Sequence, residues 1–288
     1  MINKKLLSVL LLSATLLAGC ANKEANDSSD NAGNTPAVEE SQKFTGTVVG
    51  EKLSDPTGKK SDVVVASVNF EEGKPVKVDI DVRLEDGTMK KQLSKDGGYV
   101  MVEGEEHPWH EQIELLENFL NENGCDVSKV NVLEDTTTDA VSGVSIKVSA
   151  YLDAVKEVVD SVENGTTLEE GYTGAKIVEV SSESSKDVVV TKVVFDHSKP
   201  VNVSIDVRLE DGTSKKQLSK DGGYVMVEGE EKAWHEQIAE LEAFIVENNF
   251  DLSKIVLDDN GATDAVSGVS IKVGDYVESV QTALDEVK

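Results

Sequence analysis

The sequence has few cysteines, few aromatic residues and a shortage of positive charge. Its 288 residues include two Cys, and 28 Lys and Arg stand against 55 Asp and Glu, a formal net charge of -27. Two cysteines cannot build a disulfide framework, and no residue cluster has the spacing of a zinc or iron–sulfur site. The charge excludes a nucleic-acid-binding role, because phosphate contacts need clustered Lys and Arg. It also argues against electrostatic attraction to an anionic bilayer.

The chain begins with an apolar run that is too short to span a bilayer as a stable helix. Residues 1–5 are basic, residues 6–17 are mostly apolar, and Leu-Ala-Gly-Cys ends at Cys20. This pattern predicts a signal peptide over residues 1–19. A Cys after small residues is similar to the bacterial lipobox, in which the Cys thiol receives a diacylglycerol that anchors the protein. The alternative is an ordinary signal peptide followed by a chance Cys.

Residues 20–43 contain Asn, Ser, Asp, Glu, Ala and Gly and show no apolar periodicity. Such a composition cannot bury enough apolar surface to fold. We therefore expect a flexible tether between a lipidated Cys20 and the folded part. Together with the signal peptide, the tether predicts a location at the extracellular face of a bacterial membrane, as in Gram-positive bacteria. Residues 6–19 are also a candidate source of a secreted peptide pheromone.

The remainder of the chain contains one module twice. Residues 80–113 and residues 205–238 align at an offset of 125 and are nearly identical. They differ at three pairs of positions: Met89 and Ser214, His107 and Lys232, Pro108 and Ala233. A repeat of this length is a whole domain and is longer than a solenoid unit. We therefore expect a first repeat over 44–163, a linker over 164–171 and a second repeat over 172–288.

The hydrophobic pattern changes its period along each repeat. Residues 63–70 are rich in β-branched residues and predict a strand that ends in a turn at 71–73. Apolar and polar residues alternate over 76–84, which predicts a strand with one face in the core. Apolar residues then recur at helical spacing over 109–120 and over 151–162, which predicts two amphipathic helices. Strands followed by helices indicate an α+β fold in both repeats, with a mainly antiparallel sheet packed against helices.

One short motif has the residue types needed for covalent chemistry. Asp-Ala-Val-Ser-Gly-Val-Ser occupies residues 139–145 and again residues 264–270. Gly143 lets the backbone approach a ligand, and the free N–H groups of a following helix favour phosphate. Asp139 is the only acid in the first motif, and a serine hydroxyl needs a nearby base to act as a nucleophile. The alternative is a helix-capping loop, because Asp, Ser and Gly are also common caps.

The motif, in both repeats, resembles the FMN-binding domain family of secreted flavoproteins. In that family a flavin transferase of the ApbE type moves FMN from FAD onto the last hydroxyl of a Ser/Thr-Gly-Ala-Thr type motif preceded by Asp. The resemblance implies two covalent FMN groups, on Ser145 and on Ser270. It also implies that the other motif residues contact the cofactor: Asp139, Ser142, Gly143, Val144, Asp264, Ser267, Gly268 and Val269. The chain departs from the family in having Val where Ala is usual and Ser where Thr is commoner.

A small aromatic group precedes the motif in each repeat. Tyr99 and Trp109 are candidates to flank the isoalloxazine ring of a flavin, and Met101 is a candidate to pack on its edge. The equivalent residues of the second repeat are Tyr224, Met226 and Trp234. The alternative for Trp109 is that it is the first core residue of an amphipathic helix.

Taken together, the resemblance implies a membrane-anchored electron carrier of flavin-based extracellular electron transfer rather than an enzyme. Its implied partners are the flavin transferase, a membrane electron donor such as a quinone-linked flavoprotein or dehydrogenase, and external electron acceptors. The acidic surroundings are expected to disfavour the anionic reduced flavin and to lower its potential. No metal site is predicted. The alternative function is a cofactor-free surface lipoprotein with a binding or structural role.

Overall fold

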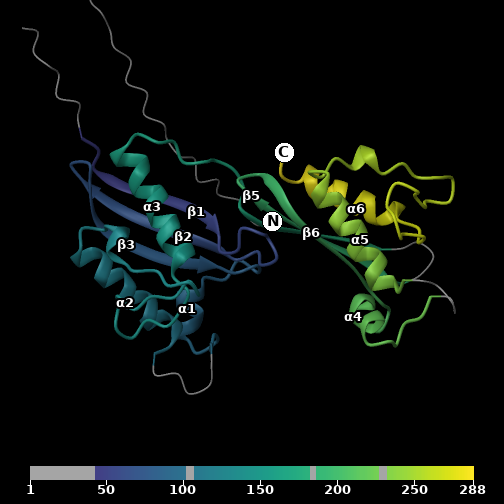
Figure 1. Cartoon of the computed structure of the whole chain (residues 1–288), viewed down its shortest axis with the longest axis horizontal. Coiled ribbons are helices and arrows are strands. Elements are labelled where there is room, and N and C mark those ends of the chain that lie inside the picture. The colour runs from purple at the N-terminus through teal and green to yellow at the C-terminus, as the bar shows by residue number, and fades with distance from the viewer. Residues whose placement is uncertain (1–42, 102–106, 182–185, 227–231) are drawn as a thin grey trace, which may run out of the picture. The chain divides into compact units, whose positions relative to one another are not determined.

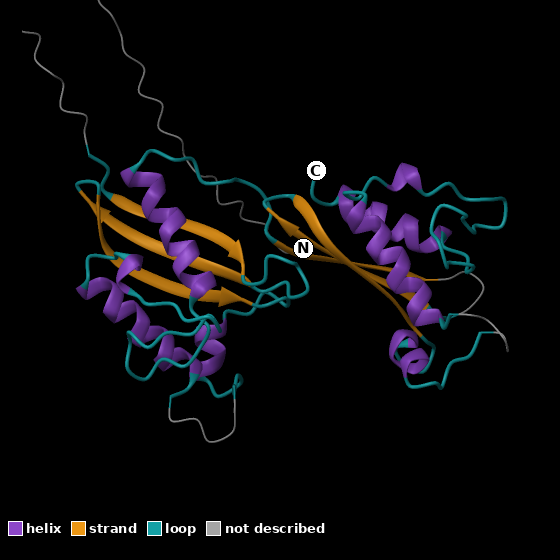
Figure 2. Cartoon of the chain, viewed as in Figure 1, coloured by secondary structure: helices purple, strands orange, loops and turns teal. Residues whose placement is uncertain are grey.

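The computed structural model describes residues 43–101, 107–181, 186–226 and 232–288. The predicted signal peptide, Cys20 and nearly all of the tether lie outside these residues. The described part contains two three-stranded antiparallel sheets and six α-helices, so the α+β class is confirmed (Figures 1 and 2). Within it, every helix is too short or too polar to cross a membrane.

The first repeat begins with a β-meander and continues with helices. Its strands pair in the order β1-β2-β3, all antiparallel. The elements are β1 (Gly46–Leu53), β2 (Val63–Glu71), β3 (Lys74–Arg83), α1 (Lys90–Lys95), α2 (Trp109–Glu122), the 3₁₀-helix η1 (Val127–Lys129) and α3 (Ser149–Glu163).

The second repeat has the same element order, with its strands paired as β4-β5-β6. Its elements are β4 (Gly174–Ser181), β5 (Val188–Asp196), β6 (Lys199–Arg208), α4 (Lys215–Lys220), α5 (Trp234–Glu247), η2 (Leu252–Lys254) and α6 (Gly274–Asp285).

The two predicted strands and the two predicted helices of the first repeat are confirmed as β2, β3, α2 and α3. The predicted turn between the strands contains Glu72 and Gly73, both with positive φ. The sequence patterns did not predict β1 or the short α1. In β1 only Leu53, at the end of the strand, is buried, so the strand has no clear alternation of apolar and polar residues.

The core of the first repeat lies between the sheet and two helices. Helix α3 packs on β1 and β2, while α2 packs against β3 (Figure 1). Ile80, Ile113 and Val155 are completely buried there. Burying an aliphatic side chain of this size contributes about 1.5–3 kcal/mol, so this layer supplies much of the stability that holds the loops in place.

Helix α2 also covers the edge of the sheet that is formed by β3. The outward N–H of Val78 donates to Asn121 Oδ1 at 2.7 Å, and that of Ile80 donates to Glu117 Oε1 at 2.6 Å. Side chains of α2 therefore take the place of a fourth strand and block edge-to-edge pairing. In the second repeat Glu242 Oε1 accepts from Ile205 N in the same way, but Val246 stands at the position of Asn121.

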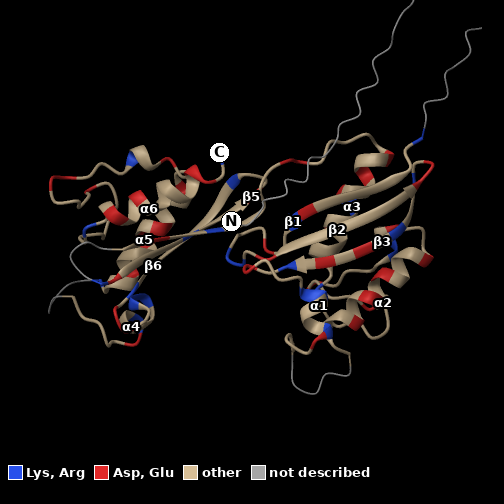
Figure 3. Ribbon diagram, turned by 180° about the vertical axis from the view of Figure 1, so that it is seen from behind, with Lys and Arg blue, Asp and Glu red and all other residues tan. Residues whose placement is uncertain are grey.

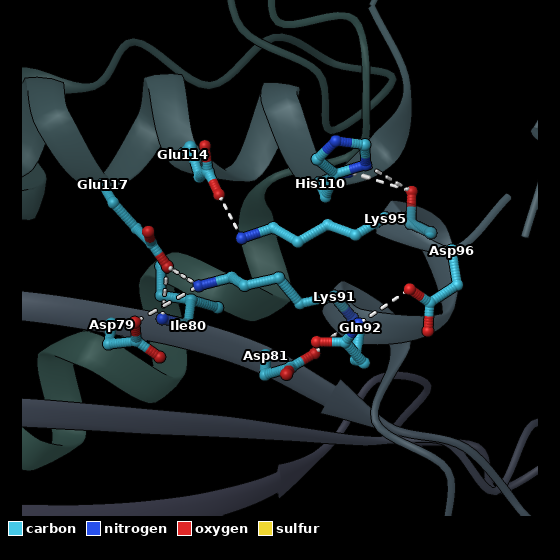
Figure 4. Close-up of polar contacts among 11 residues, drawn as sticks. Asp79, Ile80, Asp81, Lys91, Gln92, Lys95, Asp96, His110, Glu114 and Glu117 are labelled. Atoms are coloured by element: carbon cyan, nitrogen blue, oxygen red, sulfur yellow. Dashed lines mark hydrogen bonds and ion pairs between the residues drawn. The ribbon is translucent and has the colours of Figure 1, made fainter.

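A buried ion pair fastens α1 beneath α2 (Figure 4). Lys91 Nζ lies 2.7 Å from Glu117 Oε1 and 3.3 Å from Asp79 Oδ2. Burial raises the pKa of Glu117, even though the hydrogen bond from Lys91 opposes this. Burial alone lowers the pKa of Lys91, but the hydrogen bond and charge of Glu117 outweigh it, so the pKa of Lys91 is raised. Ser94 Oγ and His110 Nδ1, 2.9 Å apart, add a second link between the helices.

Candidate functional site

The motif of the first repeat lies in a loop that ends before α3 begins. Helix α3 starts at Ser149, and its N-cap residue is Val148, which makes no side-chain cap hydrogen bond. In the second repeat α6 starts at Gly274 after Val273, again without a side-chain cap. The helix-capping alternative for the motif is therefore wrong, because neither helix is capped by a motif side chain.

The motif loop alternates between the core and the solvent. Val141 and Val144 are buried in the hydrophobic core, whereas Ser142, Gly143 and Ser145 are exposed. Val266 and Val269 are buried in the same way in the second repeat. The valine that departs from the family pattern thus turns its extra methyl groups toward the interior, and the motif hydroxyls remain accessible.

Glycine is required at the centre of the motif. Gly143 has a φ of 82°, and a Cβ on it would lie 2.8 Å from Leu115 Cδ1 and 3.3 Å from the His107 ring. Gly268 has a φ of 77°, and its Cβ would lie 2.5 Å from Lys232 Nζ. A side chain at either position meets both backbone strain and a close neighbour.

A buried glutamine on α2 holds Ser145. Gln112 is 2% exposed, and its Oε1 accepts from Ser145 N at 2.7 Å, from Ile146 N at 3.1 Å and from Ser145 Oγ at 3.3 Å. Its Nε2 donates to the carbonyl oxygen of His107 at 2.8 Å. The amide is therefore fixed in one orientation, because rotating it would place its NH₂ group against two other donors.

The second repeat reproduces this arrangement. Gln237 is also 2% exposed, and its Oε1 accepts from Ser270 N at 2.7 Å, Ile271 N at 3.2 Å and Ser270 Oγ at 3.3 Å. Its Nε2 donates to Lys232 O at 3.2 Å. These glutamines are not among the site residues predicted from the sequence. The available signal was a polar residue on the apolar face of a predicted helix, three residues after a core Trp.

The motif aspartate of the first repeat is hydrogen-bonded to a residue outside the motif. Asp139 is exposed, and its Oδ1 accepts from Asn131 Nδ2 at 2.7 Å. Among the described residues, no hydrogen bond joins Asp139 to Ser142 or Ser145. Valine occupies the position of Asn131 in the second repeat. The role of the aspartate as a base stays a prediction, and it requires the carboxylate to leave Asn131.

The aromatic group is assembled around a lysine of α1. Lys90 Nζ lies 4.3 Å from the centre of the Tyr99 ring and 4.6 Å from that of Trp109. Trp109 is 1% exposed and meets Tyr151 edge to face, with 3.3 Å between Trp109 Nε1 and the Tyr151 hydroxyl. Burial raises the pKa of Tyr151 to about 12.

Trp109 is therefore a core residue, as its alternative interpretation expects, and Trp234 is buried to a similar degree at 2% exposure. Tyr99 and Met101 are half-buried and pack against the core. Tyr224 and Met226 do the same in the second repeat. Contact of these residues with a flavin stays a prediction, and Lys90 must move before a ring can lie on the indole face of Trp109.

Two hollows lie in the second repeat, and one of them reaches the first residues of its motif. One, of about 400 Å³, is lined by Asp264 and by the exposed Val256 and Leu257. The other, of about 250 Å³, is lined by Lys272 and Tyr276 among others, and Lys272 follows Ser270 by two residues. In the described ranges no group of three or more His, Cys, Asp or Glu side chains could hold a metal ion. An exposed serine with a lysine two residues further along the chain is compatible with an attached phosphate ester.

No family model matches the chain, and no curated protein matches it. Among solved structures, the chain is similar to a protein from Clostridium thermocellum whose solution NMR structure came from a structural genomics consortium. The two are 33% identical, the match covers 40% of this chain and 90% of that chain, and the TM-score is 0.31. The description of that protein names no activity.

Proposed function

We propose that each repeat is a separate FMN-binding domain and that the chain is an extracellular electron carrier with FMN joined by phosphoesters to Ser145 and Ser270. The observation that carries the proposal is the geometry of the acceptor serine. In both repeats its hydroxyl is exposed, while its backbone N–H is held by a buried glutamine at 2.7 Å. The arrangement of lipobox, tether and two such modules is similar to surface lipoproteins of the PplA type.

The chain supplies the acceptor, and a transferase of the ApbE type supplies the catalysis. Ser145 Oγ bonds to the flavin-side phosphorus of FAD, the pyrophosphate bond breaks, and AMP leaves. The hydroxyl proton passes to a base, a role that we assign to Asp139 and, in the second repeat, to Asp264. Gly143 gives the loop beside Ser145 the left-handed backbone conformation that the motif needs, with a φ of 82°.

Once attached, the flavin supplies the redox chemistry, and the protein retains and tunes it. A secreted protein that bound FMN reversibly would lose it to the medium, whereas a phosphoester does not dissociate. A lipid on Cys20 would keep the carrier between a membrane donor and external acceptors. Asp and Glu are spread over helices and loops in both repeats (Figure 3). This negative field disfavours the anionic reduced flavin and lowers its potential.

The proposal is tested by intact mass after co-expression with a flavin transferase. The unsubstituted chain should gain two FMN groups, Ser145→Ala and Ser270→Ala should each lose one, and the double variant should lose both. Ser128→Ala is the matched control, because Ser128 is an exposed serine outside the motif and its hydroxyl bonds only locally to Asp126. Two flavins on both single variants would show that the acceptor assignment is wrong. No flavin on any chain would favour a cofactor-free lipoprotein.

A further inference from the structure

We propose that Gln112 and Gln237 are positioning residues for flavin attachment, each holding the acceptor serine so that its hydroxyl faces the incoming phosphorus. The inference rests on the proposed function and adds to it a residue outside the motif. The glutamines act through the serine and do not touch the flavin.

The hydrogen bonds show which atoms are held firmly and which remain free to react. Gln112 Oε1 takes two backbone N–H groups at 2.7 and 3.1 Å, and these fix the peptide on both sides of the Ser145 side chain. The Ser145 hydroxyl donates to the same oxygen at the longer distance of 3.3 Å. That distance is longer than is usual for a hydroxyl donor, so the hydroxyl is held weakly and is free to turn toward the solvent, from which the transferase must approach.

The place of the glutamine on the helix supports a dedicated role. Gln112 lies on the buried face of α2 beside Trp109 and Ile113, where an apolar side chain would pack without any need for partners. Burying an amide is unfavourable unless its polar atoms are bonded. The partners of Gln112 are the acceptor serine, the residue that follows it, and the backbone of His107. A glutamine that served only to join the loop to the helix could bond to any residue of the loop, whereas Gln112 bonds to Ser145 and to the residue after it.

The repeat supplies a second case. The segments that lead to the motif differ, EDTTT in residues 134–138 and DNGAT in residues 259–263. Even so, Gln237 meets Ser270 at the same 2.7 Å and 3.3 Å. The approach to the motif varies, while the contact to the reacting residue does not.

The neutrality of the side chain matters as well. A glutamate at this place would keep an acceptor for the serine, but it would add a negative charge beside the phosphate and lose the donor to His107. Gln112→Glu therefore tests whether the side chain must be uncharged, and Gln112→Met tests whether it must supply a hydrogen-bond acceptor. In both variants the second repeat of the same molecule is the internal reference for the transferase.

The experiment follows flavin loading over time with the full chain, the transferase and FAD, and assigns each flavin to its repeat by peptide mass. We expect Gln112→Met and Gln112→Glu to load Ser145 at least tenfold more slowly while Ser270 loads at the normal rate. Gln237→Met should give the reverse. Amide hydrogen exchange of the flavin-free chain supplies an independent readout, since Ser145 and Ile146 should lose protection in Gln112→Met.

The control is Asn121→Val, which removes another side-chain bond of α2 to the backbone, at Val78 and away from the motif. Thermal melts show which variants are folded at the loading temperature. Normal loading of Ser145 in folded Gln112→Met, or equal slowing of loading in Asn121→Val, would overturn the positioning role. The proposed function would still stand in either case, provided that the unsubstituted chain takes up two flavins. If the unsubstituted chain takes no flavin, both proposals fail.

Discussion

The two repeats can be compared directly, because they have the same order of elements in one chain but place different side chains beside the motif. The surroundings of Ser145 and Ser270 are alike in the two repeats: the glutamine contact, the buried Trp with its Tyr partner, and a lysine over the aromatic rings. The side chain over the motif glycine is not kept, since His107 lies there in one repeat and Lys232 in the other. The shared part is what the proposed flavin attachment would use, and the differing part would let the two sites be tuned separately.

The variable residue places a different charge beside each motif. His107 Nδ1 lies 3.0 Å from Glu111, and Lys232 Nζ lies 2.7 Å from Glu240. Each side chain is thus drawn to a glutamate of the following helix. The lysine carries a full positive charge at neutral pH, whereas a histidine carries one only when protonated. The two proposed flavins are therefore not equivalent, although their attachment points are.

The largest expected effect comes from the tryptophans. Trp109→Ala and Trp234→Ala should each cost about 3–5 kcal/mol, because each empties a buried, tightly packed site. If the repeats are separate domains, each substitution should lower one of two unfolding transitions and leave the other in place. Calorimetry of the full chain measures both. A single transition that shifts equally in both variants would show instead that the repeats unfold as one unit.

Gly143→Ala and Gly268→Ala should differ in size. Both place a non-glycine residue in a left-handed conformation, which costs about 1–2 kcal/mol. In Gly143→Ala the new methyl group also meets Leu115 and the His107 ring, whereas in Gly268→Ala it meets the flexible end of Lys232, which can swing away. We therefore expect the larger loss in Gly143→Ala, measured by denaturant unfolding. Equal losses would mean that the neighbour is irrelevant.

The sheet edge offers a reciprocal exchange. Asn121→Val should cost about 1 kcal/mol, because the Val78 N–H loses its acceptor. Val246→Asn should stabilise the second repeat by part of that amount, because the new side chain gives the matching N–H of Val203 a partner. Denaturant midpoints of the two variants measure the effects. A gain from Asn121→Val would contradict edge capping by α2.

The smallest expected change in stability at neutral pH comes from the buried tyrosines, and this change grows at alkaline pH. Burial raises the pKa of Tyr151 to about 12 from its ordinary value of 10.0, so its contribution to stability is complete below about pH 10 and is lost as the pH rises through about 12. Burial also raises the pKa of Tyr276. Tyrosinate absorbance during a pH titration should show late ionisation, and Tyr151→Phe should lessen the alkaline loss of stability. An unchanged alkaline profile in that variant would remove Tyr151 as the cause.

The elements that the sequence predicted were those whose pattern depends on one face being buried. Strand β3 alternates regularly and α2 has a continuous apolar stripe, so both were found. Strand β1 has little buried surface and left no such pattern. The motif was visible because it occurs twice. Its geometry was not, because the inward turn of Val144, the approach of His107 to Gly143 and the bond from Gln112 join segments that only tertiary packing brings together.

The most direct test of the central claim is the colour of the denatured protein. The full chain, made together with a flavin transferase, is unfolded and precipitated, and the washed pellet is analysed for bound flavin. We predict a yellow pellet with two FMN groups per chain, because phosphoesters to Ser145 and Ser270 survive unfolding. A colourless pellet, with all flavin left in the supernatant, would contradict covalent attachment and the carrier function that depends on it.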